Sequence, residues 1–137
     1  MGLFGSKKLN PDHNIKRLER KLAEDMAKND PDYEFQTQKT YRGYGKRPDV
    51  YGQHKKIPHK RKIGEAKCVK ELTSVHVKQA KGYKKHPGYA SGGIIGVAKD
   101  TKVSHKVRQE AKDAGFKVKK LNVGRKKSFT EKYFLDD

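Results

Sequence analysis

The chain has 137 residues, of which 32% are hydrophobic and 36% are charged, and its formal net charge is +18. This length suits a single domain, and a basic excess far beyond the needs of solubility predicts a polyanionic partner, with nucleic acid ahead of an anionic membrane surface. The sequence contains no apolar run of membrane-spanning length and no signal-peptide core, and the single Cys68 excludes an internal disulfide framework. We therefore expect an intracellular protein, cytoplasmic or nucleoid-associated, that binds no membrane.

The first half of the chain predicts a helix followed by three strands. Residues 1–11 are rich in Gly and Lys and are expected to form a flexible basic leader. A helix is expected over residues 12–29, where apolar residues recur at helical spacing. Alternation and turn residues predict three strands, with a hairpin loop between the last two. The strands span residues 33–41, 46–51 and 61–69, and the loop spans residues 52–60.

The second half predicts alternating helices and strands. The expected elements are a helix over 74–86, a buried strand over 92–98, a helix from Ser104 to Ala114 followed by Gly115, and a strand over 116–123. A basic and then acidic tail is expected over 124–137. The order α-β-β-β-α-β-α-β indicates an α/β fold in which a mixed β-sheet is flanked by helices on both faces. One domain is expected over residues 12–123.

Three residues on the two hairpin strands are expected to carry the chemistry. Glu65 and Lys67 lie two apart in one strand and share a face, and the hairpin would bring Asp49 beside Glu65. Two carboxylates suit Mg²⁺, which keeps several waters, and the Ala66 carbonyl is a natural extra ligand. The metal would polarise a phosphate and activate water, while Lys67 orients that water or stabilises developing charge. These residues predict phosphodiester hydrolysis with Mg²⁺, for which Mn²⁺ would substitute.

Pro48-Asp49 followed by Glu65-Ala66-Lys67 resembles the PD-(D/E)XK nuclease superfamily, which includes restriction endonucleases and Holliday junction resolvases. The resemblance covers about residues 12–122 and extends to the order of the elements. It implies a restriction endonuclease-like core and a metal-dependent endodeoxyribonuclease, with the structure selectivity of a junction resolvase as one form of it. Two symmetric nicks would need a homodimer, and the residues do not separate RNA from DNA as the substrate.

Two helices extend the resemblance. Many members carry an acid on the first helix, and Glu19 lies about 40° from Ile15 on a helical wheel, beside the apolar stripe. On the second helix, Gln79 and Tyr83 share a face and resemble the Q-x-x-x-Y motif of the RecB-type branch. The resemblance implies that Glu19 and Gln79 are catalytic and that Gln79 and Tyr83 contact DNA or hold Lys67. Glu19 on the surface and Tyr83 as a packing residue are the alternatives.

Basic residues crowd the segments beside these motifs and are expected to bind phosphates. They are Lys55, Lys56, Lys60, Arg61 and Lys62 in and after the hairpin loop, and Lys84 and Lys85 after Tyr83. Charge runs are usually solvated faces, so a non-catalytic basic nucleic-acid-binding protein is the alternative function. The six His residues lack zinc-ligand spacing. His76 lies one turn before Gln79 and could reach the site, although a position on the helix surface is favoured.

Overall fold

A computed structural model describes residues 12–37, 48–85 and 90–125 of the chain. The expected leader, the second half of the first expected strand, the first two residues of the second and the tail beyond residue 125 lie outside the described residues. The last residue of the expected second helix also lies outside them.

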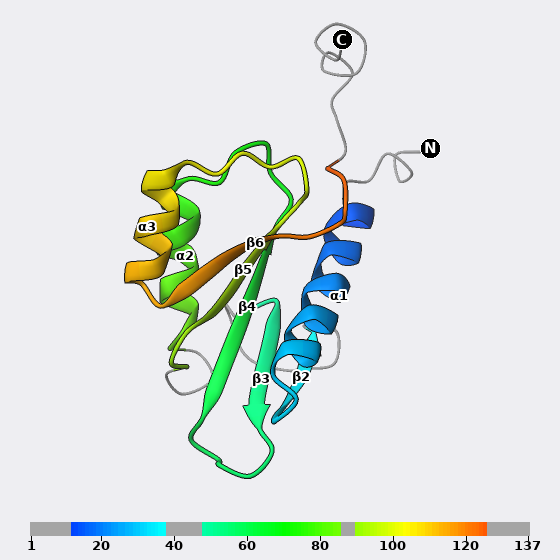
Figure 1. Cartoon of the computed structure of the whole chain (residues 1–137), viewed down its shortest axis with the longest axis vertical. Coiled ribbons are helices and arrows are strands. Elements are labelled where there is room, and N and C mark those ends of the chain that lie inside the picture. Colours follow the sequence, from blue (N-terminus) through cyan, green and yellow to red (C-terminus); the bar gives the residue numbers. More distant parts are fainter. Residues whose placement is uncertain (1–11, 38–47, 86–89, 126–137) are drawn as a thin grey trace, which may run out of the picture.

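The described elements follow one another in the predicted order (Figure 1). The helices are α1 (Asp12–Asn29), α2 (Ser74–Tyr83) and α3 (His105–Asp113). The strands are β2 (Tyr33–Thr37), β3 (Val50–His54), β4 (Arg61–Lys67), β5 (Gly93–Val97) and β6 (Phe116–Lys120).

The boundaries of β3 differ from the prediction, because the strand begins four residues later than residue 46 and continues into the expected loop. Pro48 has no N–H to donate to a ladder, and the N–H of Asp49 is taken by the Glu65 carboxylate, 3.1 Å away. Regular pairing therefore begins only at Val50, opposite Gly64. Asp49 precedes the strand instead of lying within it, and β4 ends at Lys67, two residues before the predicted end.

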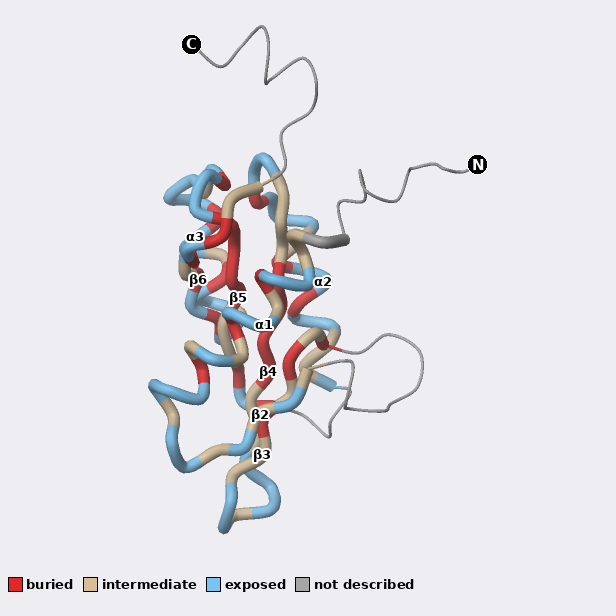
Figure 2. Tube along the Cα trace, turned by 90° about the vertical axis from the view of Figure 1, so that its right-hand side faces the viewer, coloured by how far each residue is buried: buried red, intermediate tan, exposed pale blue. Residues whose placement is uncertain are grey.

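The strands form a mixed sheet, as the element order predicted, and their order within it is β2-β3-β4-β5-β6. Antiparallel pairs join β2, β3 and β4, whereas β4, β5 and β6 run parallel. In Figure 1, α1 lies on one face of the sheet while α2 and α3 lie together on the other. Each face has its own apolar cluster, and Figure 2 shows the buried residues concentrated along the central strands.

Small residues on β4 and β5 allow α1 to pack closely against the face of the sheet opposite Glu65. A Cβ on Gly64 would lie 2.7 Å from the Met26 sulfur, and one on Gly96 would lie 3.0 Å from a Leu22 methyl carbon. Ala66 belongs to the same cluster as Leu22 and Met26. Because alternate strand residues face opposite ways, Glu65 and Lys67 point toward the α2 side.

Helix α3 begins and ends where the sequence predicts. The Ser104 hydroxyl accepts the Val107 N–H at 3.2 Å, which caps the first turn. Gly115 follows the helix with a φ of +92°, a conformation that glycine adopts without strain.

No helix among the described residues is both long enough and apolar enough to cross a membrane.

Candidate active site

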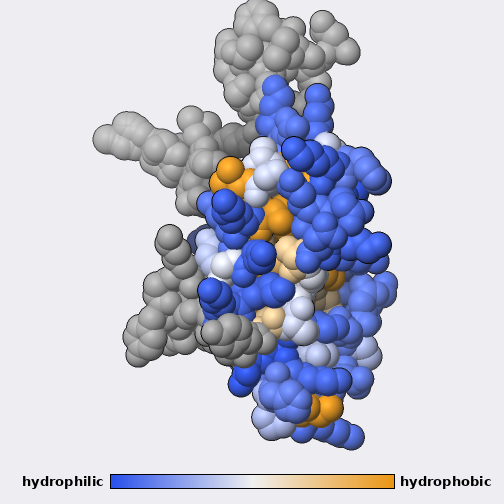
Figure 3. All heavy atoms as spheres, turned by 90° about the vertical axis from the view of Figure 1, so that its left-hand side faces the viewer, coloured by the Kyte–Doolittle hydropathy of each residue, from blue (hydrophilic) through white to orange (hydrophobic). Residues whose placement is uncertain are grey.

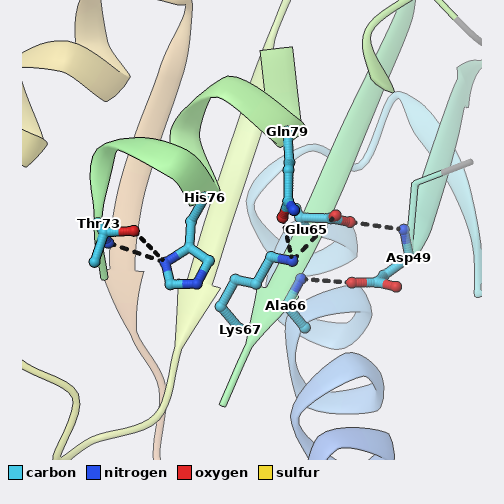
Figure 4. Close-up of polar contacts among 7 residues, drawn as sticks. All are labelled: Asp49, Glu65, Ala66, Lys67, Thr73, His76 and Gln79. Atoms are coloured by element: carbon cyan, nitrogen blue, oxygen red, sulfur yellow. Dashed lines mark hydrogen bonds and ion pairs between the residues drawn. The ribbon is translucent and has the colours of Figure 1, made fainter. Parts of the chain in front are cut away.

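The two acidic residues of the predicted cluster meet at the carboxyl end of β4 (Figure 4). Pro48 is fully buried and fixes the chain just before β3. The Asp49 N–H donates to Glu65 Oε1 at 3.1 Å, and the Ala66 N–H donates to Asp49 Oδ2 at 2.9 Å. These two hydrogen bonds extend the contact between β3 and β4 beyond their ladder, so the Pro48-Asp49 and Glu65-Ala66-Lys67 segments are held directly against each other.

Lys67 and Gln79 complete the cluster from β4 and α2. Lys67 Nζ donates to Gln79 Oε1 at 3.1 Å and lies 4.0 Å from Glu65 Oε2. The structure therefore brings together Asp49, Glu65, Lys67 and Gln79, as the sequence predicted. Gln79 holds Lys67, which is one of the two roles expected for it.

Glu65 is the only buried charged side chain among the described residues, with 3% of its surface exposed. Burial, followed by the charge and the hydrogen-bonded carboxyl of Asp49, raises the pKa of Glu65 from 4.5 to about 9. The Lys67 ammonium and the Asp49 N–H oppose this rise only in part. Near neutral pH the metal-free pair therefore holds a proton, which a bound cation would replace.

One face of α2 follows this cluster along β4. Burial and then the Lys67 ammonium lower the pKa of His76, whereas burial and then Glu65 and Asp49 raise the pKa of Tyr83. His76 therefore lies at the Lys67 end of the cluster and Tyr83 at the carboxylate end. Tyr83 also packs against the apolar cluster on the α2 side, so it combines the predicted site position with the packing alternative.

Glu19 is half-buried on α1, which covers the opposite face of the sheet from the one that carries Glu65 and Lys67. The hydrogen bonds described above join Asp49, Glu65, Lys67 and Gln79 without involving Glu19. Its catalytic role stays a prediction from the resemblance.

The hairpin lysines lie at the far end of the sheet from the carboxylates. Figure 1 shows the turn between β3 and β4 at the end opposite the start of α2. Four strand residues, or about 13 Å, separate Arg61 from Glu65 along β4. The sequence placed the turn near the site only along the chain, and phosphate binding there stays a prediction. The basic residues of the predicted set that are exposed in this turn are Lys55, Lys56 and Lys60.

Two other predicted phosphate contacts have partners within the protein. Lys62 Nζ lies 2.9 Å from an Asp30 carboxylate oxygen and 4.8 Å from the centre of the Tyr33 ring. Lys84 Nζ donates to the Ala114 carbonyl at 2.7 Å. Arg61 is half-buried, and Lys85 is exposed at the end of α2. Of these four, Lys85 is the most accessible to a polyanion.

Lys70 and Lys102 are exposed and lie side by side at the edge of the sheet where β4 and β5 end. The sequence analysis gave neither residue a role. The Lys102 N–H donates to the Lys70 carbonyl at 2.9 Å, which joins the segments that follow the two strands. The sequence could have predicted that these two lysines lie close together, because each follows a strand of the parallel part of the sheet and the carboxyl ends of parallel strands meet at one edge. Figure 3 shows that the α2 and α3 face of the molecule is largely hydrophilic, with only small apolar groups.

The residues of the cluster fit Mg²⁺ better than a metal that needs many protein ligands. The described part of the chain contains no group of three or more His, Cys, Asp or Glu side chains that could hold a metal. Asp49 and Glu65 supply two carboxylates. The N–H and C=O of a strand residue point toward the same neighbour, so the Ala66 carbonyl points toward Asp49 beyond the end of β3. Two carboxylates and a carbonyl suit a hard cation that keeps several waters, whereas structural zinc takes four protein ligands.

No protein-family model matches the chain, and neither a curated protein nor a solved structure matches it. Any function assigned to the chain rests on its own sequence and geometry.

Proposed function

We propose that the chain is a metal-dependent endodeoxyribonuclease that hydrolyses phosphodiester bonds in DNA. The observation that carries the proposal is the Asp49–Glu65 pair, in which the Glu65 carboxylate is 3% exposed and lies 4.0 Å from the Lys67 ammonium. An ordinary strand face would leave Glu65 in water. Burying a carboxylate beside a second one is costly, and such arrangements concentrate at functional sites.

The side chains fit phosphodiester hydrolysis in distinct roles. A Mg²⁺ or Mn²⁺ ion held by Asp49, Glu65 and the Ala66 carbonyl would polarise the phosphate and lower the pKa of a bound water. Lys67 supplies a positive charge that can orient the attacking water or stabilise the negative charge that develops on the phosphate. Gln79 accepts a hydrogen bond from Lys67 at 3.1 Å and so limits the positions of the ammonium.

The net charge of +18 and the resemblance to the PD-(D/E)XK superfamily support DNA as the substrate. The same resemblance supports a restriction endonuclease-like core, with Pro48-Asp49 directly before β3 and Glu65-Ala66-Lys67 at the end of the neighbouring strand β4. Exposed lysines would hold the phosphate backbone without reading bases. Selectivity for a DNA structure such as a junction, and a homodimer that makes paired cuts, belong to the same proposal.

A non-catalytic nucleic-acid-binding protein is the competing function, and the charge supports it equally well. Binding alone gives no reason to bury Glu65 next to Asp49 or to fix Lys67 with Gln79. The dependence of affinity on salt would not separate the two functions, since both predict a steep slope. Turnover in the presence of a metal separates them.

The test compares wild type with Asp49→Asn and Lys67→Ala on supercoiled, duplex, flap, single-stranded and four-way-junction DNA. Wild type should cleave at least one substrate with Mg²⁺ or Mn²⁺ and stop in EDTA. Each variant should lose roughly 100-fold or more in rate yet still bind DNA. Lys106→Ala on the exposed face of α3 removes the same charge away from the site and should cleave normally. Cleavage by Asp49→Asn and Lys67→Ala at the wild-type rate would show that the site is wrongly assigned.

A further inference from the structure

The imidazole of His76 is held in one orientation at the start of α2. Thr73 is the N-cap residue of the helix and forms a capping box with His76. His76 Nδ1 accepts the Thr73 backbone N–H at 2.9 Å and lies 3.3 Å from the Thr73 hydroxyl. A ring nitrogen that accepts a backbone N–H carries no proton, so the neutral ring carries its proton on Nε2.

The protonated edge of the ring is available on the side of the site. Figure 4 shows the imidazole beside the Lys67 side chain, with Nδ1 turned toward Thr73. Burial and the nearby Lys67 ammonium lower the pKa of His76, which favours the neutral ring. Within the described residues, no group accepts a hydrogen bond from Nε2. The ring therefore presents a fixed, neutral N–H donor next to a cation.

We propose that His76 binds a backbone phosphate of the nucleic-acid substrate through Nε2–H, which rests on the function proposed for the Asp49–Glu65–Lys67 site. The Asp49–Glu65 pair holds only one proton near neutral pH, so most hydrogen-bond donors for a phosphate must come from other residues. Lys67 lies two strand residues, or about 7 Å, beyond Glu65, and His76 lies beside Lys67. His76 would accordingly meet a phosphate next to the one that is cleaved.

Capping alone explains Nδ1 but not the position of the rest of the ring. Glu and Gln are the usual partners in a capping box, and either would accept the Thr73 N–H without placing a partly buried ionisable ring beside a cation. A neutral donor suits this position, because it can bind a phosphate oxygen without adding a second positive charge against Lys67. His76 combines both requirements in one side chain.

The first test compares His76→Ala with Thr73→Ala, a matched control that weakens the same helix cap but keeps the imidazole. Both variants should lose similar thermal stability. His76→Ala should raise the Kd for a short DNA duplex in EDTA by roughly tenfold, the size expected for a hydrogen bond to a charged group. Thr73→Ala should change the Kd by less than about twofold, and His76→Gln should restore the thermal stability while recovering only part of the affinity.

Equal effects of His76→Ala and Thr73→Ala on the Kd would overturn the proposal and leave His76 as a cap. Failure of the wild type to bind the duplex would overturn it as well. Because affinity is measured without a metal, a chain that binds but never cleaves would refute the nuclease function and still test His76.

The second test reads the ring directly in the full chain labelled with ¹⁵N-histidine. The His76 signal is identified by its absence from the spectrum of His76→Gln. We expect a neutral ring protonated on Nε2 at neutral pH, with the Nε2 resonance shifting more than the Nδ1 resonance when the duplex is added. An imidazolium, an Nδ1-protonated ring, or an Nε2 resonance that the duplex does not move would contradict the proposal.

Discussion

Glu65→Gln should change how the stability of the metal-free protein depends on pH. Burial and the Asp49 charge raise the pKa of Glu65 from 4.5 to about 9 in the folded chain. Between these values the folded chain holds a proton that the unfolded chain has released, so stability falls as pH rises toward about 9. Glutamine resembles the protonated acid and cannot ionise, so the variant should escape this loss.

The size of the effect follows from one proton. One bound proton changes the free energy of unfolding by about 1.4 kcal/mol per pH unit. Between about pH 6 and about pH 8, wild type should therefore lose about 3 kcal/mol relative to Glu65→Gln. Other groups titrate alike in both proteins and cancel in this difference.

Urea unfolding in EDTA, followed by circular dichroism at several pH values, measures the difference. Glu24→Gln, at an exposed position on α1, is the matched control and should follow wild type at every pH. Adding Mg²⁺ should stabilise wild type more at the higher pH, because the ion replaces the proton, and should stabilise Glu65→Gln less. Parallel pH dependence of wild type and Glu65→Gln would show that Glu65 does not hold a proton in the folded state.

Three further predictions concern packing, positioning and binding. Gly64→Val should destabilise the fold by about 1–3 kcal/mol in urea unfolding, because even a Cβ would lie 2.7 Å from a side chain of α1. A Cβ on Gly82 would have nothing within 4 Å, so Gly82→Ala should stabilise the fold by about 0.5–1 kcal/mol. A stabilising Gly64→Val and a destabilising Gly82→Ala would contradict this packing. Gln79→Ala should slow cleavage roughly tenfold without changing the melting temperature, because Lys67 loses its acceptor, and an unchanged rate would remove Gln79 from the site. Replacing three hairpin lysines by Ala should weaken DNA binding and reduce the slope of log affinity against log salt concentration by up to about 3. The single-turnover cleavage rate at saturating protein should not change. An unaltered slope would exclude these lysines as phosphate contacts. These lysines are Lys55, Lys56 and Lys60.

Most of the fold follows from local patterns in the sequence. The bounds of α1 match the prediction because its apolar stripe and the Asp-Pro-Asp that follows it are unambiguous. The predicted start of β3 at residue 46 was wrong, because the N–H of Asp49 donates to the side chain of Glu65, which lies 16 residues away in sequence. Contacts of that kind depend on tertiary structure, and no local pattern reports them.

The meeting of the acidic pair was predictable in kind, because a hairpin must place its two strands side by side. The burial of Glu65 was not, since an isolated Glu-x-Lys on a strand is usually solvated. The distance between the hairpin turn and the carboxylates did not follow from the sequence pattern either, because closeness along the chain is not closeness in space. Asp49 and Glu65 lie at one end of the β3–β4 pair, so the turn that connects these strands lies at the other end. A rise of about 3.3 Å per strand residue sets the distance between the two ends.

The decisive experiment for nuclease function is an assay of DNA cleavage by the purified wild-type chain, with and without Mg²⁺. We expect the chain to nick or cut at least one DNA structure when Mg²⁺ is present and EDTA to abolish the reaction. Asp49→Asn prepared in the same way should be inactive while still binding. A wild-type chain that binds these substrates without cleaving any of them, or an Asp49→Asn variant that cleaves as fast as wild type, would contradict the proposed nuclease function.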